Sequence, residues 1–382
     1  MIGVQLSAEN YVSIFIDAIE IYRVVMPLVY PFRTAFGDDA AIESVLVKIT
    51  SGTHFGWGEA SPWAAPAYSG EWAHGCFQVV RDWLGPQLVG QRIDSGKELG
   101  DALGRFKGNY FAKASLDLAW WDLYSRQQAA PLWRVLGGCK SQVDVGADFG
   151  VMDHVEDLLL VMDDAVAQGF RRIKLKFRPG WELEVMKAVR RRFPKTTIHI
   201  DCNSAYSLDD LDLFQAADEL QFAMIEQPLA HDDLVDHAKL QAKLRTPLCL
   251  DESITSVAKA RKAIELGSCQ WINIKPGRVG GLTSALEIHS LCQHAGIPCW
   301  VGGMLESAVG ASHCIALATL PNILYPSDIF PSHRFYQKDL AHPAIELSGR
   351  AQVCASERIG IGCEPDEERL RKCQLDFARL EV

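Results

Sequence analysis

Four short runs of the sequence decide the fold: TTIHIDCN (196–203), FAMIEQPL (222–229), TPLCLDES (246–253) and WINIKPG (271–277). Each run is mostly apolar up to one ionisable residue near its end, and these residues are Asp201, Glu226, Asp251 and Lys275. They follow one another at intervals of 25, 25 and 24 residues, so each charge occupies an equivalent place in successive copies of one structural unit. We therefore expect three acids and a lysine to face a common centre.

The same spacing continues on both sides of these runs, in VDVGADFGV (143–151), RRIKLKF (171–177), PCWVGGM (298–304) and ILYPSDI (323–329). A step of about 25 residues is the length of a strand, a crossover helix and two loops. Eight such units predict an α/β fold with a TIM-type (β/α)7–8 barrel. An open doubly wound sheet is the alternative, but it would not usually place charged groups at the ends of five successive strands.

The sequence before the barrel has a different pattern. Residues 14–60 alternate between apolar and polar side chains, with a turn at SGTHFG, which predicts antiparallel strands. An apolar stripe in 111–127 predicts a helix, through Ala112, Leu116, Ala119, Trp120 and Leu123. We predict an α+β capping domain over 1–136, the barrel over 137–335, and a segment over 336–382 that returns to the capping domain. Within the cap, about 28–40 has no clear period and is predicted with equal weight to be a lid or a surface loop.

Composition excludes several functions. The 382 residues carry a formal net charge of −10 and no basic stripe, which argues against nucleic acid as a partner. The sequence has no run of eighteen apolar residues, so no membrane-spanning helix is predicted, and the amino end predicts a strand and not a secretion signal. Eleven cysteines without CxxC spacing predict reduced thiols in a cytoplasmic protein and no metal bound through sulfur. The sequence leaves the oligomeric state open, including a homo-oligomer.

The charged positions predict a metal site. Side chains alternate along a strand, so Lys174 and Lys176 point the same way, as do Asp201 and Asn203. Carboxylates that converge in a dry site repel one another unless a cation neutralises them. Ligands that are all oxygen favour a hard ion, so Mg²⁺ or Mn²⁺ is expected at Asp201, Glu226 and Asp251.

The lysines predict the reaction class. A lysine near a divalent cation has its pKa lowered toward the working pH and becomes a usable base. We expect Lys176 and Lys275 to act on a substrate carboxylate, removing the proton from the carbon beside it while the ion stabilises the enediolate. His199, two residues before Asp201, is expected to be a core histidine and not a ligand.

These residues resemble those of the enolase superfamily, whose members use a lysine or histidine base together with Mg²⁺. The motifs KLK (174–176), IEQPL, LDESI, NIKPGRVGGL, GGMLESAVG and YPSDI are similar to the o-succinylbenzoate synthase and N-succinylamino acid racemase family of its muconate-lactonizing subgroup. PFRTAFG and GWGEASP of the capping domain also fit, so the resemblance covers essentially the whole chain.

The resemblance implies roles for individual residues. Lys176 would be the base, Lys174 its charged neighbour, and Lys275 the acid/base or cationic stabiliser on the opposite face. Asp201, Glu226 and Asp251 would hold Mg²⁺. Residues implied to orient these groups or to line the substrate pocket are Asn203, Glu252, Arg278, Phe32, Gly302, Gly303, Met304, Glu306 and Asp148.

The resemblance implies an o-succinylbenzoate synthase, a lyase of menaquinone biosynthesis that dehydrates a succinyl-hydroxycyclohexadiene carboxylate. An N-succinylamino acid racemase is the alternative, and Arg278 supports it. A non-catalytic barrel that binds a carboxylate is a third and remote interpretation. Asp148 departs from the small neutral residue that relatives tend to have, and its charge would oppose a succinyl carboxylate. Trp63 and Tyr68 could also reshape the pocket.

Overall fold

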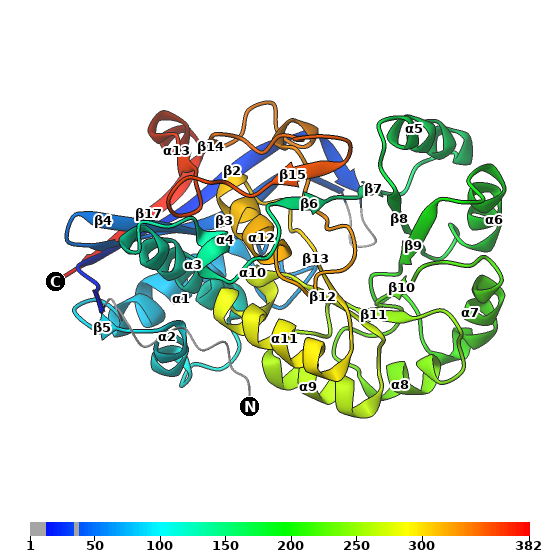
Figure 1. Ribbon diagram of the computed structural model, residues 1–382, viewed down its shortest axis with the longest axis horizontal. Coiled ribbons are helices and arrows are strands. Elements are labelled where there is room, and N and C mark those ends of the chain that lie inside the picture. The colour runs from blue at the N-terminus through cyan, green and yellow to red at the C-terminus, as the bar shows by residue number, and fades with distance from the viewer. Residues whose placement is uncertain (1–12, 34–37) are drawn as a thin grey trace.

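The computed structural model describes residues 13–33 and 38–382, and part of the predicted lid therefore lies outside the described residues. The amino-terminal part contains a four-stranded antiparallel sheet in the order β17-β2-β3-β4 (Figure 1). Its strands are β2 (Ala18–Arg33), β3 (Asp38–Ser51), β4 (His54–Ala60) and β17 (Gln374–Glu381). The last strand of the chain pairs with β2, so the carboxyl-terminal segment completes this sheet, as the sequence predicted.

Helices of the cap pack against this sheet. The helices of this region are α1 (Ala73–Val79), α2 (Gly96–Leu103), α3 (Tyr110–Gln127) and α4 (Leu132–Val135). The predicted apolar stripe of α3 is buried, and so are most of its other faces. A Cβ atom at Gly56 or Gly58 of β4 would overlap the backbone of α3, so these two glycines permit the close approach of sheet and helix.

The larger part is a parallel sheet of seven strands with helices on its outer side (Figure 1). The strands run in sequence order: β7 (Ala147–Phe149), β8 (Arg172–Lys176), β9 (Thr197–Asp201), β10 (Ile225–Glu226), β11 (Leu248–Leu250), β12 (Trp271–Ile274) and β13 (Cys299–Val301). The crossover helices are α5 (Val155–Ala167), α6 (Leu183–Arg192), α7 (Leu211–Asp218), α8 (Val235–Gln241), α9 (Val257–Leu266), α11 (Leu282–Ala295) and α12 (Ala308–Ala318). The short helix α10 (Pro276–Val279) follows β12 directly.

The eighth predicted strand is not a regular strand. The segment 323–328 makes single parallel bridges to its two neighbours, from Ile323 to Cys299 and from Ser327 to Val145. Pro326 has no backbone N–H, so it cannot donate to a continuous ladder at this place. The segment nevertheless lies between the last and the first strand and closes the barrel. Inside the barrel, Met224, Cys249 and Trp300 form a buried cluster of their own, whereas Ile200 and Leu250, which precede the inward-facing Asp201 and Asp251, belong to the larger core between strands and helices.

The carboxyl-terminal segment folds back over both parts. Its elements are β14 (Ala341–His342), β15 (Gln352–Cys354), β16 (Glu364–Pro365) and α13 (Glu367–Cys373). Strand β15 pairs with β6 (Gln142–Asp144), which precedes the barrel, and the short β1 (Ile14–Phe15) pairs with β5 (Arg92–Ile93). The predicted division of the chain at 136/137 and 335/336 stays a prediction.

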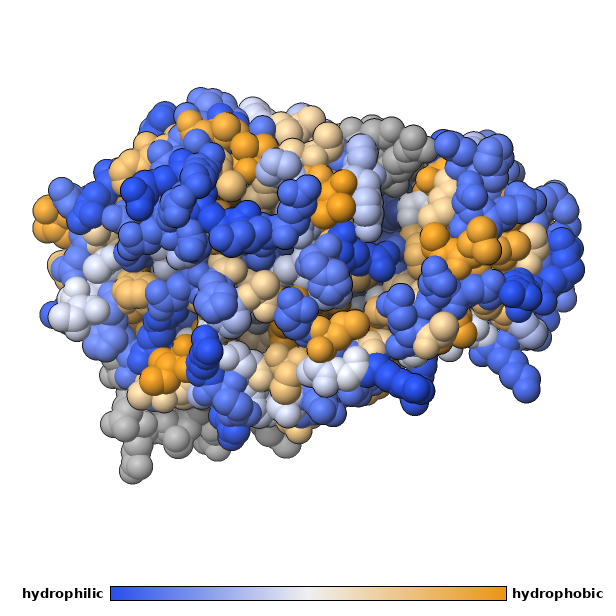
Figure 2. Space-filling model, turned by 90° about the horizontal axis from the view of Figure 1, so that it is seen from above, coloured by the Kyte–Doolittle hydropathy of each residue, from blue (hydrophilic) through white to orange (hydrophobic). Residues whose placement is uncertain are grey.

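The described residues include no helix long and apolar enough to cross a membrane. The face of the molecule drawn in Figure 2 is mostly hydrophilic, with apolar residues in scattered groups.

The cap and the barrel are joined by a buried carboxylate. Glu59, in β4 of the cap, is 1% exposed and accepts hydrogen bonds from the Ser307 backbone N (3.1 Å), the Ser307 hydroxyl (2.5 Å) and the Gly310 backbone N (2.9 Å). Ser307 and Gly310 belong to the first turn of α12, where backbone N–H groups have no partner within the helix. A side chain of the cap therefore completes a helix of the barrel.

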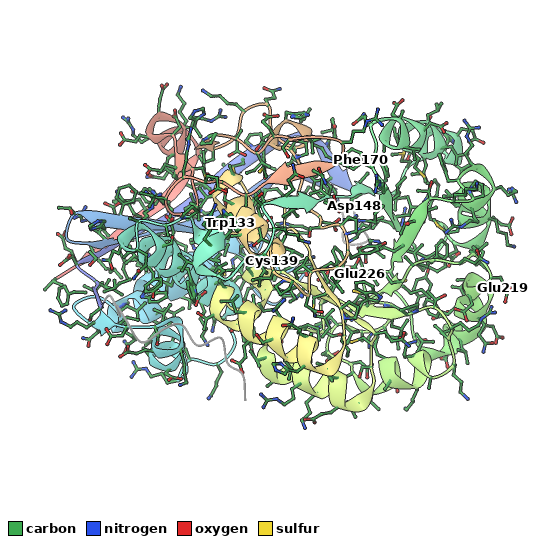
Figure 3. The ribbon with its side chains drawn as sticks, viewed as in Figure 1. Trp133, Cys139, Asp148, Phe170, Glu219 and Glu226 are labelled. Carbon is green, nitrogen blue, oxygen red and sulfur yellow. The ribbon has the colours of Figure 1, made fainter. Side chains whose placement is uncertain are left out.

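We predict that Glu59→Ala lowers the free energy of unfolding by about 2–4 kcal/mol, because it leaves buried N–H donors without an acceptor. Chemical denaturation of the purified protein measures this quantity. Glu219, at the carboxyl end of α7 and labelled on the outside of the barrel in Figure 3, is the control. Its ion pair with Arg245 is exposed, so Glu219→Ala should cost under about 1 kcal/mol. Equal losses for the two variants would contradict the role assigned to Glu59.

Candidate active site at the carboxyl ends of the barrel strands

The register of the sheet aligns the charges predicted from the sequence. Lys176 lies opposite Asp201, and Asp201 lies opposite Glu226, at the carboxyl ends of β8, β9 and β10. Asp148 lies opposite Lys174 one step deeper between β7 and β8. In Figure 3, Asp148 and Glu226 both lie in the central part of the molecule, at the inner edge of the barrel, whereas Glu219 lies outside. The even spacing in the sequence thus becomes proximity in space.

Lys174 lies between two carboxylates. Its Nζ is 3.0 Å from Asp201 Oδ2 and 2.9 Å from Glu226 Oε2, and all three side chains are almost fully buried. Burial alone would lower the pKa of Lys174, but the charges of Asp201 and Glu226 outweigh burial and raise it well above its usual value. The lowering expected from the sequence was for a base lysine beside a divalent cation, whereas the nearest charges to Lys174 here are carboxylates.

Lys176 contacts the same aspartate from the end of β8. Its Nζ donates to Asp201 Oδ2 at 2.8 Å, so this oxygen is shared by two ammonium groups. Burial opposes ionisation of Asp201, but Lys174 and Lys176 outweigh it and hold the pKa of this carboxyl well below its usual range. Asp201 is therefore a carboxylate at every pH at which the protein would work.

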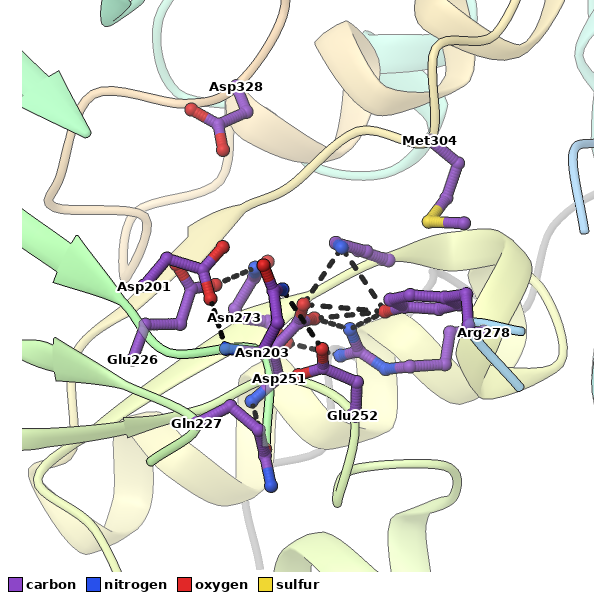
Figure 4. Close-up of polar contacts among 12 residues, drawn as sticks. Asp201, Asn203, Glu226, Gln227, Asp251, Glu252, Asn273, Arg278, Met304 and Asp328 are labelled. Carbon is purple, nitrogen blue, oxygen red and sulfur yellow. Dashed lines mark hydrogen bonds and ion pairs between the residues drawn. The ribbon is translucent and has the colours of Figure 1, made fainter. Parts of the chain in front are cut away.

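A second group of charges surrounds Asp251. Lys275 Nζ donates to Asp251 Oδ2 at 2.9 Å, and the Arg278 guanidinium pairs with Oδ1 (Figure 4). Arg278 also donates to the backbone oxygens of Ile254 (2.8 Å) and Asn273 (2.5 Å), which fixes its plane. Burial would lower the pKa of Lys275, but acidic groups around it, among them Tyr68 and Glu252, outweigh burial and raise it.

Amides and a further acid connect the two groups. Asn203 donates to Glu252 Oε1 at 3.2 Å, and its backbone N donates to Asp201 Oδ1 at 3.1 Å. Asn273 donates to Glu226 Oε1 at 2.8 Å. Burial, followed by the charge of Asp201, raises the pKa of Glu252 to about 7. The sequence analysis did not identify Asn273, although it lies two residues before Lys275 on the same strand and so faces the same side.

The donor set can be tested for its fit to a divalent cation. Among the described residues, no three His, Cys, Asp or Glu side chains already converge on one point as metal ligands, since Lys174 lies between Asp201 and Glu226 and Arg278 pairs with Asp251. These three carboxylates nevertheless already bind the cationic nitrogens of lysine and arginine. All the atoms that could serve as metal ligands here are oxygen atoms. Buried acceptors without a hydrogen-bond partner remain beside them: Asn203 Oδ1, Glu252 Oε2 and Asn273 Oδ1. The excess of oxygen acceptors fits a hard cation.

A cavity opens above these charges, between the barrel and the cap. Its lining includes Lys174, Lys176, Asp201, Asn203 and Lys275 from the strands and Phe32, Trp63 and Tyr68 from the cap, together with Asp148, Gly303, Met304, Leu305, Asp328 and Phe330. A Cβ at Gly303 would lie 2.6 Å from the Asp328 backbone oxygen, and a Cβ at Gly302 would lie 2.8 Å from Cε of Lys275. Both glycines therefore allow close approach, although Gly302 does not itself line the cavity.

Two acidic residues at this site were not given a role from the sequence: Asp328 was not identified, and the role of Asp148, in β7, was left open. Asp328, in the segment that closes the barrel, pairs with Lys174 (3.2 Å) and with the buried Arg172 (2.5 Å). Its position at the end of the eighth apolar run could have identified it. Asp148 has a buried Oδ1 with no hydrogen-bond partner among the described residues, while its backbone oxygen accepts from Arg334 at 2.5 Å.

His199 and Glu306 do not contact the lysine Nζ atoms. His199 is buried, with Nε2 3.3 Å from Glu226 Oε2 and Nδ1 3.2 Å from the Tyr325 hydroxyl, as expected of a core histidine. Glu306 forms no ion pair with Lys275 among the described contacts; its Oε2 accepts from the Met304 backbone N at 2.8 Å. Burial raises the pKa of Glu306 to about 7.

Comparison with known proteins agrees with this architecture. Residues 18–137 match the family model "Mandelate racemase / muconate lactonizing enzyme, N-terminal domain", and residues 158–369 match "Enolase C-terminal domain-like". The chain belongs to the enolase superfamily. It is thus an enzyme with a capping domain and a barrel, as the sequence motifs indicated.

Similar proteins within this superfamily include o-succinylbenzoate synthases and N-succinylamino acid racemases. The chain is 43% identical over 369 residues to an o-succinylbenzoate synthase of Geobacillus stearothermophilus, covering 96% of this chain and 98% of that protein. It is 43% identical over 347 residues to an N-succinylamino acid racemase of Thermus thermophilus, covering 91% and 94%. The crystal structure of an enolase superfamily member from Listeria innocua matches with a TM-score of 0.93 and 34% identity, over 96% of this chain and 99% of that one.

We predict that Glu306 makes stability depend on pH. Folding raises the pKa of the Glu306 carboxyl from 4.5 to about 7, so the folded state binds this proton more tightly than the unfolded state does. The contribution of this carboxyl to the free energy of unfolding is therefore complete below pH 4.5 and is lost as the pH rises through 7. Glu306→Gln stays neutral, so between pH 4.5 and 7.5 it should lose less stability than the wild type, by up to about 3 kcal/mol. Urea denaturation across this range checks it. The exposed variant Glu287→Gln is the control, and identical slopes for wild type and Glu306→Gln would refute the prediction.

Proposed function

We propose that the protein is a Mg²⁺-dependent o-succinylbenzoate synthase, a lyase that forms its aromatic product by removing a proton alpha to a carboxylate and then losing water. The observation that carries this proposal is that Lys176 and Lys275 reach one cavity from β8 and β12, with three buried carboxylates on the strands between them. Relatives at 40–43% identity with the name o-succinylbenzoate synthase support the choice of substrate.

Asp201, Glu226 and Asp251 would hold the metal ion, and Mn²⁺ would suit the same oxygen donors. When bound, the ion supplies positive charge that stabilises the enediolate form of the substrate carboxylate. Asn203 orients Asp201 through its backbone N, and Asn273 orients Glu226 through its amide. These bonds keep the carboxylates in place whichever cation they contact.

Lys176 would act as the base. Its Nζ lies at the surface of the cavity, and Asp201 is its ion-pair partner among the described residues, so the neutral amine must form as that pair loosens. Lys176 takes the alpha proton, and the resulting ammonium returns a proton to the departing hydroxyl group, so that water leaves and the ring becomes aromatic. Lys174 and Lys275 stay positive, in keeping with their raised pKa values, and stabilise the negative charge on the intermediate.

Racemisation of N-succinylamino acids is the second candidate function. It requires a base on each face of the alpha carbon, whereas dehydration requires one. Lys275 lines the same cavity as Lys176, and the buried Arg278 next to it shares Asp251, so the chain has a candidate for the second base. Relatives with the name N-succinylamino acid racemase support this candidate. A barrel that only binds a carboxylate is the remaining alternative.

The assay that tests the proposal follows two signals with Mg²⁺-loaded protein. Ultraviolet absorbance measures aromatisation of the cyclohexadiene substrate, and NMR in D₂O measures alpha-proton exchange in N-succinylamino acids. We expect aromatisation, with exchange as the signature of the second function. Folded, metal-loaded protein that produces neither signal would sink both enzymatic proposals and leave a binding barrel.

We predict that Lys176→Ala lowers the rate of aromatisation by at least about 10²–10⁴-fold, since it removes the base. The control is Lys187→Ala, on the outer helix α6, where the lysine forms an exposed ion pair with Glu184. That variant should keep the wild-type rate. Near-normal turnover by Lys176→Ala would show that the base has been assigned to the wrong lysine.

A further inference from the structure

A loop of the cap, residues 61–72, reaches into the barrel and carries Tyr68 to the second group of charges. The loop is fixed at both ends. Glu71 accepts hydrogen bonds from the backbone N of Phe111 and of Ala112 (both 3.2 Å) in the first turn of α3, and the Trp63 indole donates to the Met304 backbone oxygen at 3.0 Å. Tyr68 is 6% exposed, so it is held within the interface between cap and barrel.

The Tyr68 hydroxyl lies among three charged groups. Lys275 Nζ donates to it at 3.1 Å and Arg278 Nη1 at 3.2 Å, while the hydroxyl lies 3.3 Å from Asp251 Oδ1 and can donate to it. A phenol has one donor and can accept two hydrogen bonds, so these contacts use its whole capacity. The Lys275 Nζ also lies 4.7 Å from the centre of the Tyr68 ring, in a cation–π contact.

Within the described part of the chain, the other lysine, Lys176, has no such contact with the cap. Lys176 pairs with Asp201 on the neighbouring strand, and no described residue of the cap forms a hydrogen bond or ion pair with its Nζ. Lys176 and Lys275, which both line the cavity, therefore differ in what holds them. Lys176 is positioned by the barrel, and Lys275 is positioned by the barrel and the cap together.

We propose that Tyr68 is a positioning residue for Lys275: its hydroxyl and ring, together with Asp251, hold Nζ on one face of the cavity. The proposal deepens the proposed function and rests on it. According to this proposal, the reactivity of Lys275 depends on a side chain of the capping domain, whereas the reactivity of Lys176 does not. Removal of the hydroxyl should therefore affect one face of the substrate.

The test compares the two enantiomers of an N-succinylamino acid in D₂O with Mg²⁺-loaded Tyr68→Phe. Lys275→Ala identifies which enantiomer loses its alpha proton to Lys275. For that enantiomer, Tyr68→Phe should slow exchange by about 10–10²-fold, because displacement of a reacting group by about 1 Å has effects of this size. Exchange of the other enantiomer should stay within about threefold of wild type by the same reasoning. Equal slowing of both, or of neither, overturns the proposal.

Tyr22→Phe is the matched control, because Tyr22 lies in the cap sheet and its hydroxyl contacts Glu20 at 3.1 Å, away from the cavity. It should leave the ratio of the two exchange rates unchanged. A general loss of folding would reduce both rates together, so a change of the ratio in Tyr68→Phe reports on position and not on stability.

A second measurement does not depend on turnover. Tyr68→Phe should lower the thermal denaturation midpoint by more in the wild-type background than in the Lys275→Met background. The reason is that the stability effects of substitutions at two residues in direct contact do not add. Equal shifts in the two backgrounds overturn the proposal even if the protein proves inactive toward these substrates. If the wild type exchanges neither enantiomer, the racemase candidate fails, and this cycle alone decides whether Tyr68 holds Lys275.

Discussion

Everything at the site depends on pairing of opposite charges inside the barrel. Lys174, Asp201 and Glu226 are each under 4% exposed, and a buried charge that lost its partner would destabilise the fold by several kcal/mol. Parallel strands in register bring these side chains into contact, and the contacts in turn specify the register. Asp251 repeats the arrangement with Lys275 and Arg278. The same pairs that neutralise the interior place Lys174, Lys275 and Asp201 in the lining of one cavity, with Glu226 and Asp251 paired to these lysines behind it.

The cap completes what the barrel begins. Glu59 supplies acceptors to the first turn of α12, and Trp63 donates to the backbone of Met304, so the loops after β13 are held partly by the other domain. Tyr68 reaches as far as Asp251. Under the proposed function, the groups that abstract the proton lie on rigid strands and the cap supplies variable side chains above them, an arrangement in which the substrate can change while the proton abstraction is kept.

The sequence predicted the parts of the site that follow a period. The interval of about 25 residues gave the strands and their charged ends, because one strand and one crossover helix repeat with nearly constant length. The interruption of the eighth strand at Pro326 was missed, since apolar spacing does not record a missing N–H. Tyr68 was identified only as a pocket-shaping residue, because its contacts with Asp251 and Lys275 span about two hundred residues and depend on how cap and barrel dock. The directions of the lysine pKa shifts required the actual distances to carboxylates.

Binding of Mn²⁺ to the purified full-length protein, followed by the EPR signal of the free ion, tests most directly whether the buried carboxylates form a cation site. The account predicts a single bound ion per chain, and a loss of affinity of at least about tenfold in Asp201→Asn and Glu226→Gln. Asp117→Asn, which alters a buried acid in α3 of the cap that accepts hydrogen bonds from Thr283 in α11, should leave the affinity unchanged. No bound ion, or the wild-type affinity in Asp201→Asn, would contradict the account.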